Sequence, residues 1–486
     1  MSNVSKEQFD ELKGKGLTFP VLVSVKEDEM EAVEIFHGIK SDYKFILEDR
    51  DRKQNLRYSY IGFNPEMAIK YEDGNTYIVR ELQKDNVSIE NYAEGLLEAV
   101  KKHVYVPFHG ANTEFPFIGG GLGYIGYDCI SSLENILVNS KSKKEMDIPE
   151  AMLMIYKNIL VFDHENKVLN LIYNVKPDEK MALKDIEKYL NSIYEVIKCN
   201  RNMEKFREVS MKSEGGNEFT SNFTKEQFCG LVKKAKEHVV KGDVFQVVIS
   251  QRFLKDTGSN PYDIYRRLRL KNPSPYMFYI DFKDFKLIGA SPESLVKVRG
   301  REVETNPIAG TRKRGRDSRE DEEIARELLQ DPKEVAEHVM LVDLGRNDVG
   351  KISEFGTVNL SSFMKIENFS KVMHIVSEVK GELKDGMDAI DAFKACFPAG
   401  TVSGAPKVRA MEIIDELEES KRGFYAGAVG YFSFNGNMDV AIAIRTMLYK
   451  DKKVYIGAGA GIVYDSDPES EYKETINKAK GIMEVV

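Results

Sequence analysis

Short apolar runs of the β type alternate with amphipathic helical patterns along the whole chain, and this alternation limits the folds open to it. Strands are predicted at residues 45–47, 159–162, 168–173, 244–250, 276–280 and 454–458. Helices are predicted at residues 184–197 and after Thr224, which forms a capping box with Gln227, while Gly242 ends that helix. No segment repeats with a period of about 20–50 residues, which excludes solenoids and propellers.

Length and charge narrow the class of protein further. The 486 residues can form two or three cores or one large intertwined fold. The 70 Lys and Arg residues against 78 Asp and Glu residues give a net charge of −8, which argues against a nucleic-acid or anionic-membrane partner. No apolar run reaches the roughly 18 residues that span a membrane, and the first residues lack the apolar segment of a secretory signal. Four cysteines without CxxC spacing indicate neither a zinc knuckle nor a disulfide scaffold. We therefore expect a cytoplasmic enzyme.

A polar stretch near the middle of the chain has the composition of a domain boundary. Residues 200–222 contain Gly-Gly and show little apolar periodicity. We expect an N-terminal region over residues 1–215 and a C-terminal catalytic domain over residues 222–484. A surface loop would have the same composition.

Two helices far apart in the sequence are predicted to begin in the same way. Asp331 and Asp467 suit N-cap positions, and each is followed by Pro at the first helical position. In each helix two acids three residues apart share one face. These acids are Glu334 with Glu337, and Glu471 with Glu474. For either helix alone, complementing the helix dipole would explain them.

The two acidic pairs indicate a metal site if they converge. On the first helix Val335, Val339 and Val342 form an apolar stripe opposite the acids, so a narrow acidic face would line a cleft. The second helix follows the run GAGAG at residues 457–461, whose bare backbone suits close approach to a ligand. Four converging carboxylates need a cation between them, and oxygen ligands indicate Mg²⁺ rather than zinc.

Cationic groups near these acids favour an anionic small molecule. Arg445 in a β-like run can make a bidentate contact with a carboxylate. Lys478 can assist it or can simply form an i,i+4 ion pair with Glu474. The basic run at residues 312–316 is predicted to be a solvated loop.

Two further segments have both a functional and a structural interpretation. Residues 396–407 combine two Pro and two Gly, so they form either a rigid loop whose amides and Thr401 hydroxyl face an anion, or a plain connector. His374 lies among apolar neighbours, and the pattern alone predicts a core histidine.

Eight segments carry a resemblance to a known family. They are GDVFQVVISQRF (242–253), NPSPYMFY (272–279), SPES (291–294), PIAGTRKRG (307–315), DPKEVAEHVMLVDLGRND (331–348), VMHIVSEV (372–379), CFPAGTVSGAPKVRAMEII (396–414) and GAGAGIVYDSDPESEYKETINKA (457–479). In their order and spacing they resemble the large subunits of anthranilate synthases, within the chorismate-utilising enzymes. RYSYIG (57–62) and GGGLGYIGYD (119–128) extend the resemblance into the N-terminal half.

The resemblance implies both a fold and a reaction. The implied fold is α+β, with large antiparallel sheets packed face to face, helices outside, and the N-terminal half as an additional subdomain. The implied reaction is Mg²⁺-dependent amination of chorismate at C2 with loss of the C4 hydroxyl, followed by elimination of pyruvate to give anthranilate. That reaction is the first committed step of tryptophan biosynthesis.

The resemblance also assigns roles to residues. The implied metal site consists of Glu334, Glu337, Glu471 and Glu474. Glu293 matches the acid that protonates the departing C4 hydroxyl, so we expect it to be shielded from water, with a raised pKa. His374 matches the histidine needed for loss of pyruvate, which raises it from a core residue to a catalytic one. The implied substrate-binding residues are Gln246, Ala309, Gly310, Thr311, Thr401, Tyr425, Arg445, Gly459, Ala460, Gly461 and Lys478.

Two positions distinguish among the relatives. Isochorismate and salicylate synthases have a lysine that activates water where this chain has Gln246, and a neutral amide is a poor base. Aminodeoxychorismate synthases commonly have a nucleophilic lysine where this chain has Ala309. Both residues favour anthranilate as product, and aminodeoxychorismate synthase component I is the alternative. A silent sensor would not need the five intact acids, and a phosphoryl-transfer enzyme would need a P-loop or kinase-type loop.

Partners and regulation follow from the same resemblance. The chain has no Gly-x-Cys-x-Gly nucleophile elbow, so a separate glutamine amidotransferase subunit (component II) is expected to supply ammonia in a hetero-oligomer. Tryptophan is expected to act as feedback inhibitor. The implied tryptophan-binding residues are Asp49, Pro275, Tyr276, Met277 and Phe278. Many relatives have Ser where Asp49 stands.

Overall fold

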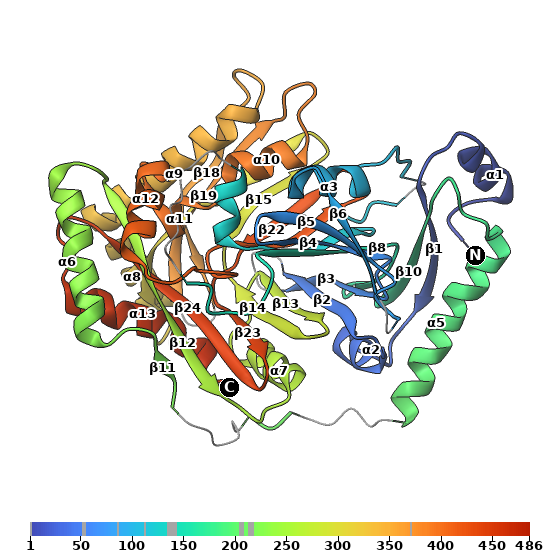
Figure 1. Cartoon of the computed structure of the whole chain (residues 1–486), viewed down its shortest axis with the longest axis horizontal. Helices are drawn as coiled ribbons and strands as arrows, with labels where there is room; N and C mark the ends of the chain where they lie inside the picture. The colour runs from blue at the N-terminus through green and yellow to red at the C-terminus, as the bar shows by residue number, and fades with distance from the viewer. Residues whose placement is uncertain are drawn as a thin grey trace.

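Two antiparallel sheets form the body of the molecule, with helices around them (Figure 1). The computed structural model describes residues 2–50, 55–84, 87–110, 113–133, 143–203, 209–211, 218–369 and 372–486. Each sheet contains twelve strands among these residues. The expected α+β fold with large antiparallel sheets is confirmed.

The first sheet combines strands from both ends of the chain. Its order is β1 (Phe19–Lys26), β10 (Val168–Val175), β9 (Asn158–Asp163), β3 (Leu56–Phe63), β2 (Tyr43–Arg50), β13 (Tyr276–Phe282), β14 (Phe285–Ser291), β23 (Thr446–Lys450), β24 (Lys453–Ile462), β12 (Gln246–Asp256) and β11 (Thr220–Ser221), with β20 (Gly404–Ala405) paired to β12.

The second sheet is built in the same mixed way. Its order is β17 (Ile308–Lys313), β19 (Val372–Glu382), β16 (Glu302–Thr305), β15 (Ser294–Arg299), β22 (Met438–Ile442), β21 (Ala428–Ser433), β7 (Gly120–Ile125), β8 (Ala151–Tyr156), β4 (Met67–Glu72), β5 (Asn75–Arg80) and β6 (Ser88–Tyr92), with β18 (Asn359–Asn368) paired to β19.

The helices connect these strands. They are α1 (Lys6–Gly14), α2 (Ala32–Gly38), α3 (Leu96–Val104), the 3₁₀ turn Tyr127–Cys129, α4 (Ile130–Leu133), α5 (Leu183–Met203), α6 (Lys225–Lys241), α7 (Pro261–Lys271), α8 (Ser318–Gln330), α9 (Pro332–Ile352), α10 (Ala389–Cys396), α11 (Gly400–Ser403), α12 (Lys407–Leu417) and α13 (Pro468–Met483). The predicted capping box of α6 is confirmed, and Gly242 ends this helix with φ +80°. None of the helices in the described part of the chain is long and apolar enough to cross a membrane.

The two halves of the chain share both sheets. Strand β2 from the N-terminal half pairs with β13 from the C-terminal half, with Asp49 opposite Tyr276 and Leu47 opposite Phe278. Strand β7 pairs with β21 in the second sheet. Part of the proposed boundary, residues 204–208 and 212–217, lies outside the described residues. The N-terminal half therefore extends the C-terminal sheets, and its first strands also build a second apolar cluster with α2, α5 and α7.

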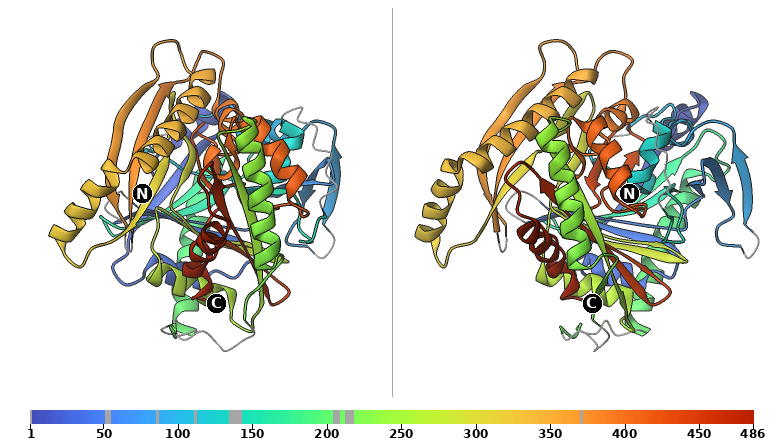
Figure 2. Two further views of the ribbon diagram at one scale, coloured as in Figure 1. Left: turned by 90° about the vertical axis from the view of Figure 1, so that its left-hand side faces the viewer. Right: turned by 60° about the vertical axis from the view of Figure 1, so that its left-hand side comes forward.

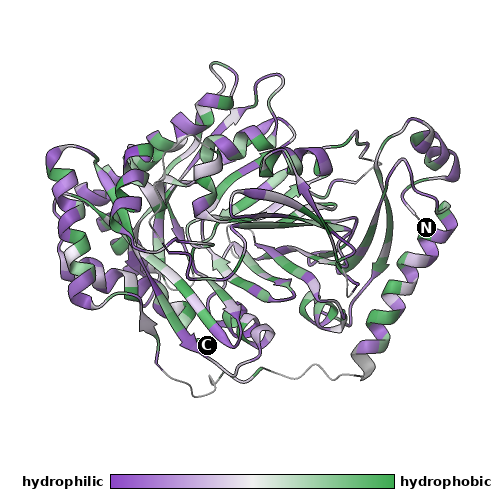
Figure 3. Cartoon of the chain, in the orientation of Figure 1, coloured by the Kyte–Doolittle hydropathy of each residue, from purple (hydrophilic) through white to green (hydrophobic). Residues whose placement is uncertain are grey.

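The main core lies between the two sheets. Phe45 of the first sheet contacts Tyr156 of the second with ring centroids 4.8 Å apart, and Tyr124 of the second contacts Phe282 of the first at 5.5 Å. Figure 3 shows hydrophobic residues concentrated along the strands, whereas the peripheral helices carry long hydrophilic stretches. Face-to-face packing of the sheets thus buries most of the strand side chains.

Helices α9 and α13 begin as the sequence predicts. The Asp331 carboxylate accepts from the backbone N–H of Lys333 at 3.0 Å, and that of Asp467 accepts from Ser470 N–H at 2.9 Å. Helix α9 packs on β17 and β19, whereas α13 packs on β24 and α6 (Figure 2). Each acidic first turn is therefore anchored to a different sheet.

Candidate active site

Gln246 lies between the two acidic helix starts. Its Nε2 donates to Glu337 Oε1 of α9 at 2.9 Å. On its other side, a Cβ added at Gly461 of β24 would lie 2.4 Å from the same Nε2. The charge of Lys333 at the start of α9 also acts on Glu471 of α13. The starts of α9 and α13 are therefore close enough for Lys333 to act on Glu471, and the convergence of the two acidic pairs on one ion stays a prediction.

Each acid of α9 has a defined partner. Arg312 of β17 donates to Glu334 Oε1 at 2.9 Å and to Asp331 Oδ2 at 2.8 Å, and these contacts raise the pKa of Arg312. The prediction that residues 312–316 form a solvated loop is therefore wrong for Arg312. Arg312 is 19 residues from Asp331 and 22 residues from Glu334, so helical spacing rules could not predict these contacts.

The acids of α13 differ in exposure. Glu471 is buried, and this burial raises the pKa of its carboxyl. The negative charge of Glu474 raises the pKa of Glu471 further. Glu474 accepts from Lys478 Nζ at 2.6 Å, and Lys478 Nζ also donates to Gly459 O at 3.1 Å. Lys478 thus ties the acidic turn to β24, in addition to forming the i,i+4 ion pair.

The predicted amphipathic orientation of α9 needs correction. Val339 of the expected buried stripe is 37% exposed, whereas His338, beside the acid Glu337, is fully buried and bonds through Nε2 to Ser377 Oγ at 2.6 Å. Burial lowers the pKa of His338 to about 4. The helix turns its polar residues inward because β19 offers a hydroxyl partner, which a hydropathy pattern does not report.

The acids supply oxygen donors from two helices, and this donor set suits Mg²⁺. Among the described residues, no group of three or more His, Cys, Asp or Glu side chains is arranged to hold an ion. The metal site of four carboxylates inferred from the sequence therefore stays a prediction. Mg²⁺ usually keeps several waters and takes one or two carboxylates plus a substrate group, so two of these acids would be enough to hold the ion.

Glu293 is a buried carboxyl between β14 and β15. It is 7% exposed, and burial raises its pKa to about 8, against a lowering by the Thr401 hydroxyl and the charge of Lys478. Thr401 Oγ1 is itself buried and makes no hydrogen bond of normal geometry within the described residues. The expectation of a shielded carboxyl with a raised pKa is met, and a carboxyl with this pKa holds its proton at neutral pH.

His374 of β19 is held in one orientation. Its Nδ1 lies 2.9 Å from Gly310 O and 3.1 Å from Thr311 Oγ1, and its ring packs edge-on to Phe369. A carbonyl oxygen only accepts hydrogen bonds, so we assign the proton to Nδ1, which leaves the Nε2 lone pair available. Burial lowers the pKa of His374, and the nearby charge of Arg445 lowers it further.

The segment that carries Gly310 is a bulge in strand β17. The pairing with β19 shifts between Ala309 and Thr311, and Gly310 has φ +63°. A Cβ on Gly310 would lie 3.3 Å from Glu334 Oε2. The bulge therefore turns one carbonyl toward His374 and brings β17 close to the acidic turn, while Ala309 stays buried.

Arg445 lies at the centre of the charged groups. It sits between β22 and β23 with φ +50°, rather than inside a strand as expected. Its charge acts on His374, and the charge of Glu474 acts on it. Burial lowers the pKa of Arg445, and within the described part of the chain no carboxylate lies within ion-pair distance of it. A largely enclosed guanidinium without such a partner suits an anionic ligand.

The glycine-rich run of β24 accommodates protein side chains. A Cβ at Gly457 would lie 2.3 Å from the ring of Tyr425, and one at Gly459 would lie 2.9 Å from its hydroxyl. Gln246 fills the corresponding space at Gly461. Protein side chains therefore fill the space beside these three glycines, and the prediction that this backbone, with the buried Ala460, binds a ligand stays a prediction.

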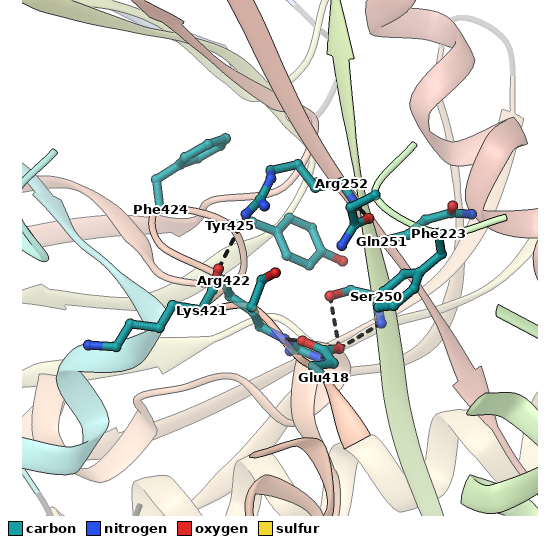
Figure 4. Close-up of a pocket in the computed structure, with 12 residues that line it drawn as sticks. Phe223, Ser250, Gln251, Arg252, Glu418, Lys421, Arg422, Phe424 and Tyr425 are labelled. Carbon is teal, nitrogen blue, oxygen red and sulfur yellow. Dashed lines mark hydrogen bonds and ion pairs between the residues drawn. The ribbon is translucent and has the colours of Figure 1, made fainter. Parts of the chain in front are cut away.

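Tyr425 lies beside a buried ion pair, with the Arg422 guanidinium 5.9 Å from the centre of its ring (Figure 4). Arg422 Nε donates to Glu418 Oε2 at 2.8 Å, and Glu418 Oε1 accepts from the Ser250 N–H at 2.8 Å. Burial works against the Arg422 charge, but Glu418 raises the pKa of Arg422 above its ordinary range. For Tyr425, burial raises the pKa to about 12, so its hydroxyl stays protonated. The i,i+4 spacing of Glu418 and Arg422 is the sequence signal that points to this pair.

The residues expected to bind tryptophan lie together in a separate pocket. Asp49, Tyr276, Met277 and Phe278 line a cavity of about 40 Å³ that also contacts β21 and β22. Pro275 lies next to it, with its carbonyl accepting from Arg50 N–H at 3.4 Å. The pocket thus uses strands of both sheets and of both halves of the chain.

Comparison with known proteins identifies the class. The sequence profile of chorismate binding enzymes matches residues 42–484. The chain therefore belongs to the family of chorismate-binding enzymes.

Within that family, the chain is similar to anthranilate synthase component 1 of several bacteria. It is 44% identical to the protein from Acetivibrio thermocellus, over 96% of this chain and 95% of the relative, and 44% identical to the one from Lactococcus lactis, over 95% and 98%. The crystal structure of anthranilate synthase component I from Streptococcus pneumoniae superposes with a TM-score of 0.79 at 42% identity, covering 88% of this chain and 92% of that chain. The menaquinone-specific isochorismate synthase of Escherichia coli shares the fold alone, with a TM-score of 0.70 at 16% identity over 99% and 98% of the two chains.

Proposed function

We propose that this protein is the chorismate-using component of an anthranilate synthase, a lyase that converts chorismate and ammonia into anthranilate and pyruvate. The relatives named above support this assignment over nearly their whole length. The observation that carries the chemistry is the buried Glu293 carboxyl, whose raised pKa suits a general acid.

The substrate carries two carboxylates, and the site supplies cations and hydroxyls to match them. Arg445 is enclosed without an ion-pair partner among the described residues, and Tyr425 and Thr401 present hydroxyls. Lys478 lies between Glu474 and Gly459. We assign these groups to substrate binding.

The first step needs an acid at the ring hydroxyl. Protonated Glu293 gives its proton to the C4 oxygen as the C4–O bond breaks and water leaves, while ammonia forms a bond to C2 and loses its extra proton. Gln246 cannot act as a base toward a nucleophile because its amide is neutral and its Nε2 is engaged with Glu337. Ammonia needs no such base because it brings its own lone pair.

The second step needs a base that is neutral at physiological pH. His374 Nε2 carries a free lone pair, and the lowered pKa of His374 keeps the ring uncharged. We assign to it removal of the C2 proton as the bond from the ring to the pyruvyl oxygen breaks and the ring becomes aromatic.

Mg²⁺ is the proposed metal. Glu337 and Glu474 would hold it, with Glu334 and Glu471 close by. When bound, the ion supplies positive charge that offsets a substrate carboxylate in the transition state. Arg312 of β17 would then hold the Glu334 carboxylate in place through their ion pair.

Ammonia is proposed to come from a glutamine amidotransferase subunit, because the chain lacks a glutaminase nucleophile. Tryptophan is proposed to inhibit the enzyme through the pocket that contains Asp49 and Tyr276.

Product analysis tests the proposal. Purified protein with chorismate, Mg²⁺ and ammonium should yield anthranilate and pyruvate without any lyase partner. The rival product, aminodeoxychorismate, would appear without pyruvate. Ala309 disfavours that rival because a buried methyl group cannot act as the lysine does.

A further inference from the structure

A cavity beside Glu293 is almost separate from the candidate site. It has a volume of about 40 Å³ between β15, α9 and the turn before α11, and of the site residues described above only Glu293 and Thr401 line it. On α9 it is lined by Leu341, Gly345 and Asp348, which follow Glu337 at helical spacing. The cavity therefore continues from the site along the inner face of α9.

Two buried hydroxyls in the lining of this cavity have no hydrogen-bond partner of normal geometry in the described residues. They are Thr401 Oγ1 and Ser294 Oγ. Buried polar atoms are nearly always paired, and water pairs them where the protein does not. On α9 the cavity is also lined by Asp348, which accepts from Lys407 Nζ at 2.7 Å and from Lys351 Nζ at 3.2 Å. Polar groups of α9, β15 and α11 thus line the cavity.

The proposed reaction produces a water molecule and a deprotonated Glu293 beside this cavity. When Glu293 protonates the C4 hydroxyl, one water molecule forms beside it and the carboxyl is left charged. Burial disfavours that charge, and Lys478 from the α13 side is the cation whose charge acts on it. The water has to leave and the carboxylate has to regain a proton before the next turnover. Substrate occupies the other side of Glu293 during catalysis.

We propose that this cavity is a water chamber for Glu293, which takes up the water released from C4 and returns a proton to the carboxylate between turnovers. The proposal rests on the proposed function. The balance is complete: Glu293 loses one proton to the leaving oxygen and regains one through the chamber water, while the added nitrogen releases its extra proton to solvent. Ser294 and Asn306 then act as positioning residues for this water.

Rapid-quench kinetics with saturating chorismate and ammonium tests the proposal. Ser294→Val keeps the volume of the side chain similar but removes a hydroxyl that has no hydrogen-bond partner of normal geometry in the described chain and otherwise interacts with Tyr276. The first turnover should proceed at the wild-type rate because Glu293 starts protonated. Later turnovers should slow by about tenfold, so a burst of one anthranilate per site appears. Asn306→Leu, also in the lining, should give the same burst.

Ser259→Val is the matched control, because Ser259 Oγ is also buried and unpartnered within the described residues but lies outside this cavity. It should show no burst. Equal slowing of the first and later turnovers, or no slowing in either lining variant, would overturn the proposal. A raised KM for ammonium at unchanged kcat would also overturn it, by assigning the cavity to ammonia. If one lining variant does not fold, the other decides the outcome. Failure of the wild-type protein to form anthranilate would instead contradict the proposed function.

Discussion

Glu293 and His374 form a pair of titratable groups whose environments shift both pKa values toward their proposed tasks. Burial raises the pKa of Glu293 to about 8 and lowers that of His374. At pH 7 the carboxyl is therefore protonated and the imidazole neutral. An acid and a base are thus available at the same pH, whereas a glutamate exposed to water would be ionised at pH 7.

The first prediction concerns pH dependence. As pH rises through about 8, Glu293 loses its proton, so kcat/KM for chorismate should fall. As pH falls through the lowered pKa of His374, the base becomes charged and the rate should fall again. Initial rates at constant free ammonia from pH 5 to 10 measure this profile. A rate that still rises above pH 9 at constant free ammonia would contradict the role of Glu293.

The second prediction separates the two steps. His374→Ala removes the proposed base but leaves Glu293 and Arg445 in place, so an aminated compound that still carries its pyruvyl group should accumulate. Anthranilate formation should fall by at least about 100-fold, in the range usual for loss of a general base. Mass spectrometry of quenched reactions measures both compounds. Loss of chorismate consumption without any such compound would assign His374 to the first step.

At the residue scale, sequence patterns predicted some features and missed others. Residue type and local spacing were enough for the N-caps Asp331 and Asp467. The roles of Glu293 and His374 came from the family resemblance alone, because a buried carboxyl and a buried histidine have no distinctive spacing. Arg312 was misjudged because its partner Glu334 is brought to it only by the packing of α9 on β17.

At the scale of elements, helices α9 and α13 each deliver an acidic turn to the same region from different sheets. Gln246 and Lys478 then bridge the helices to β12 and β24. The similar starts of the two helices were visible in the sequence, but their convergence depends on two sheets packing face to face. The buried face of α9 was mispredicted because His338 is buried against Ser377.

The third prediction tests the proposed metal pair. Glu474→Gln should weaken Mg²⁺ binding by at least about 10- to 100-fold, because a neutral amide replaces a charged ligand. Isothermal titration with Mg²⁺ alone measures this without relying on activity. Glu469→Gln is the matched control on the same helix, since Glu469 forms a surface ion pair with Lys225. Equal Mg²⁺ affinity in both variants would contradict the assignment.

At the scale of the whole molecule, the shared sheets link the proposed inhibitor pocket to the site. Tyr276 in the pocket pairs with Ser291 of β14, which leads directly to Glu293 and β15. The pairing of β2 with β13 places Asp49 beside Tyr276. The sequence predicted a boundary between residues 215 and 222 but did not indicate that strands of the two halves pair in shared sheets. Pairing between distant strands leaves no local pattern.

The fourth prediction concerns that pocket. Tryptophan should inhibit the enzyme, and Asp49→Ala should raise the half-inhibitory concentration by about tenfold through loss of a charged acceptor for the ligand ammonium. Asp42→Ala is the control, because Asp42 is an exposed acid just before the same strand. Inhibition curves at fixed chorismate measure the effect. Equal sensitivity of the two variants would place the inhibitor elsewhere.

The most direct test of the central claim is the product formed from chorismate by the purified chain with Mg²⁺ and ammonium. The proposed site predicts anthranilate and pyruvate in equal amounts, and neither product from Glu293→Gln. Formation of aminodeoxychorismate without pyruvate, or undiminished anthranilate from Glu293→Gln, would contradict it.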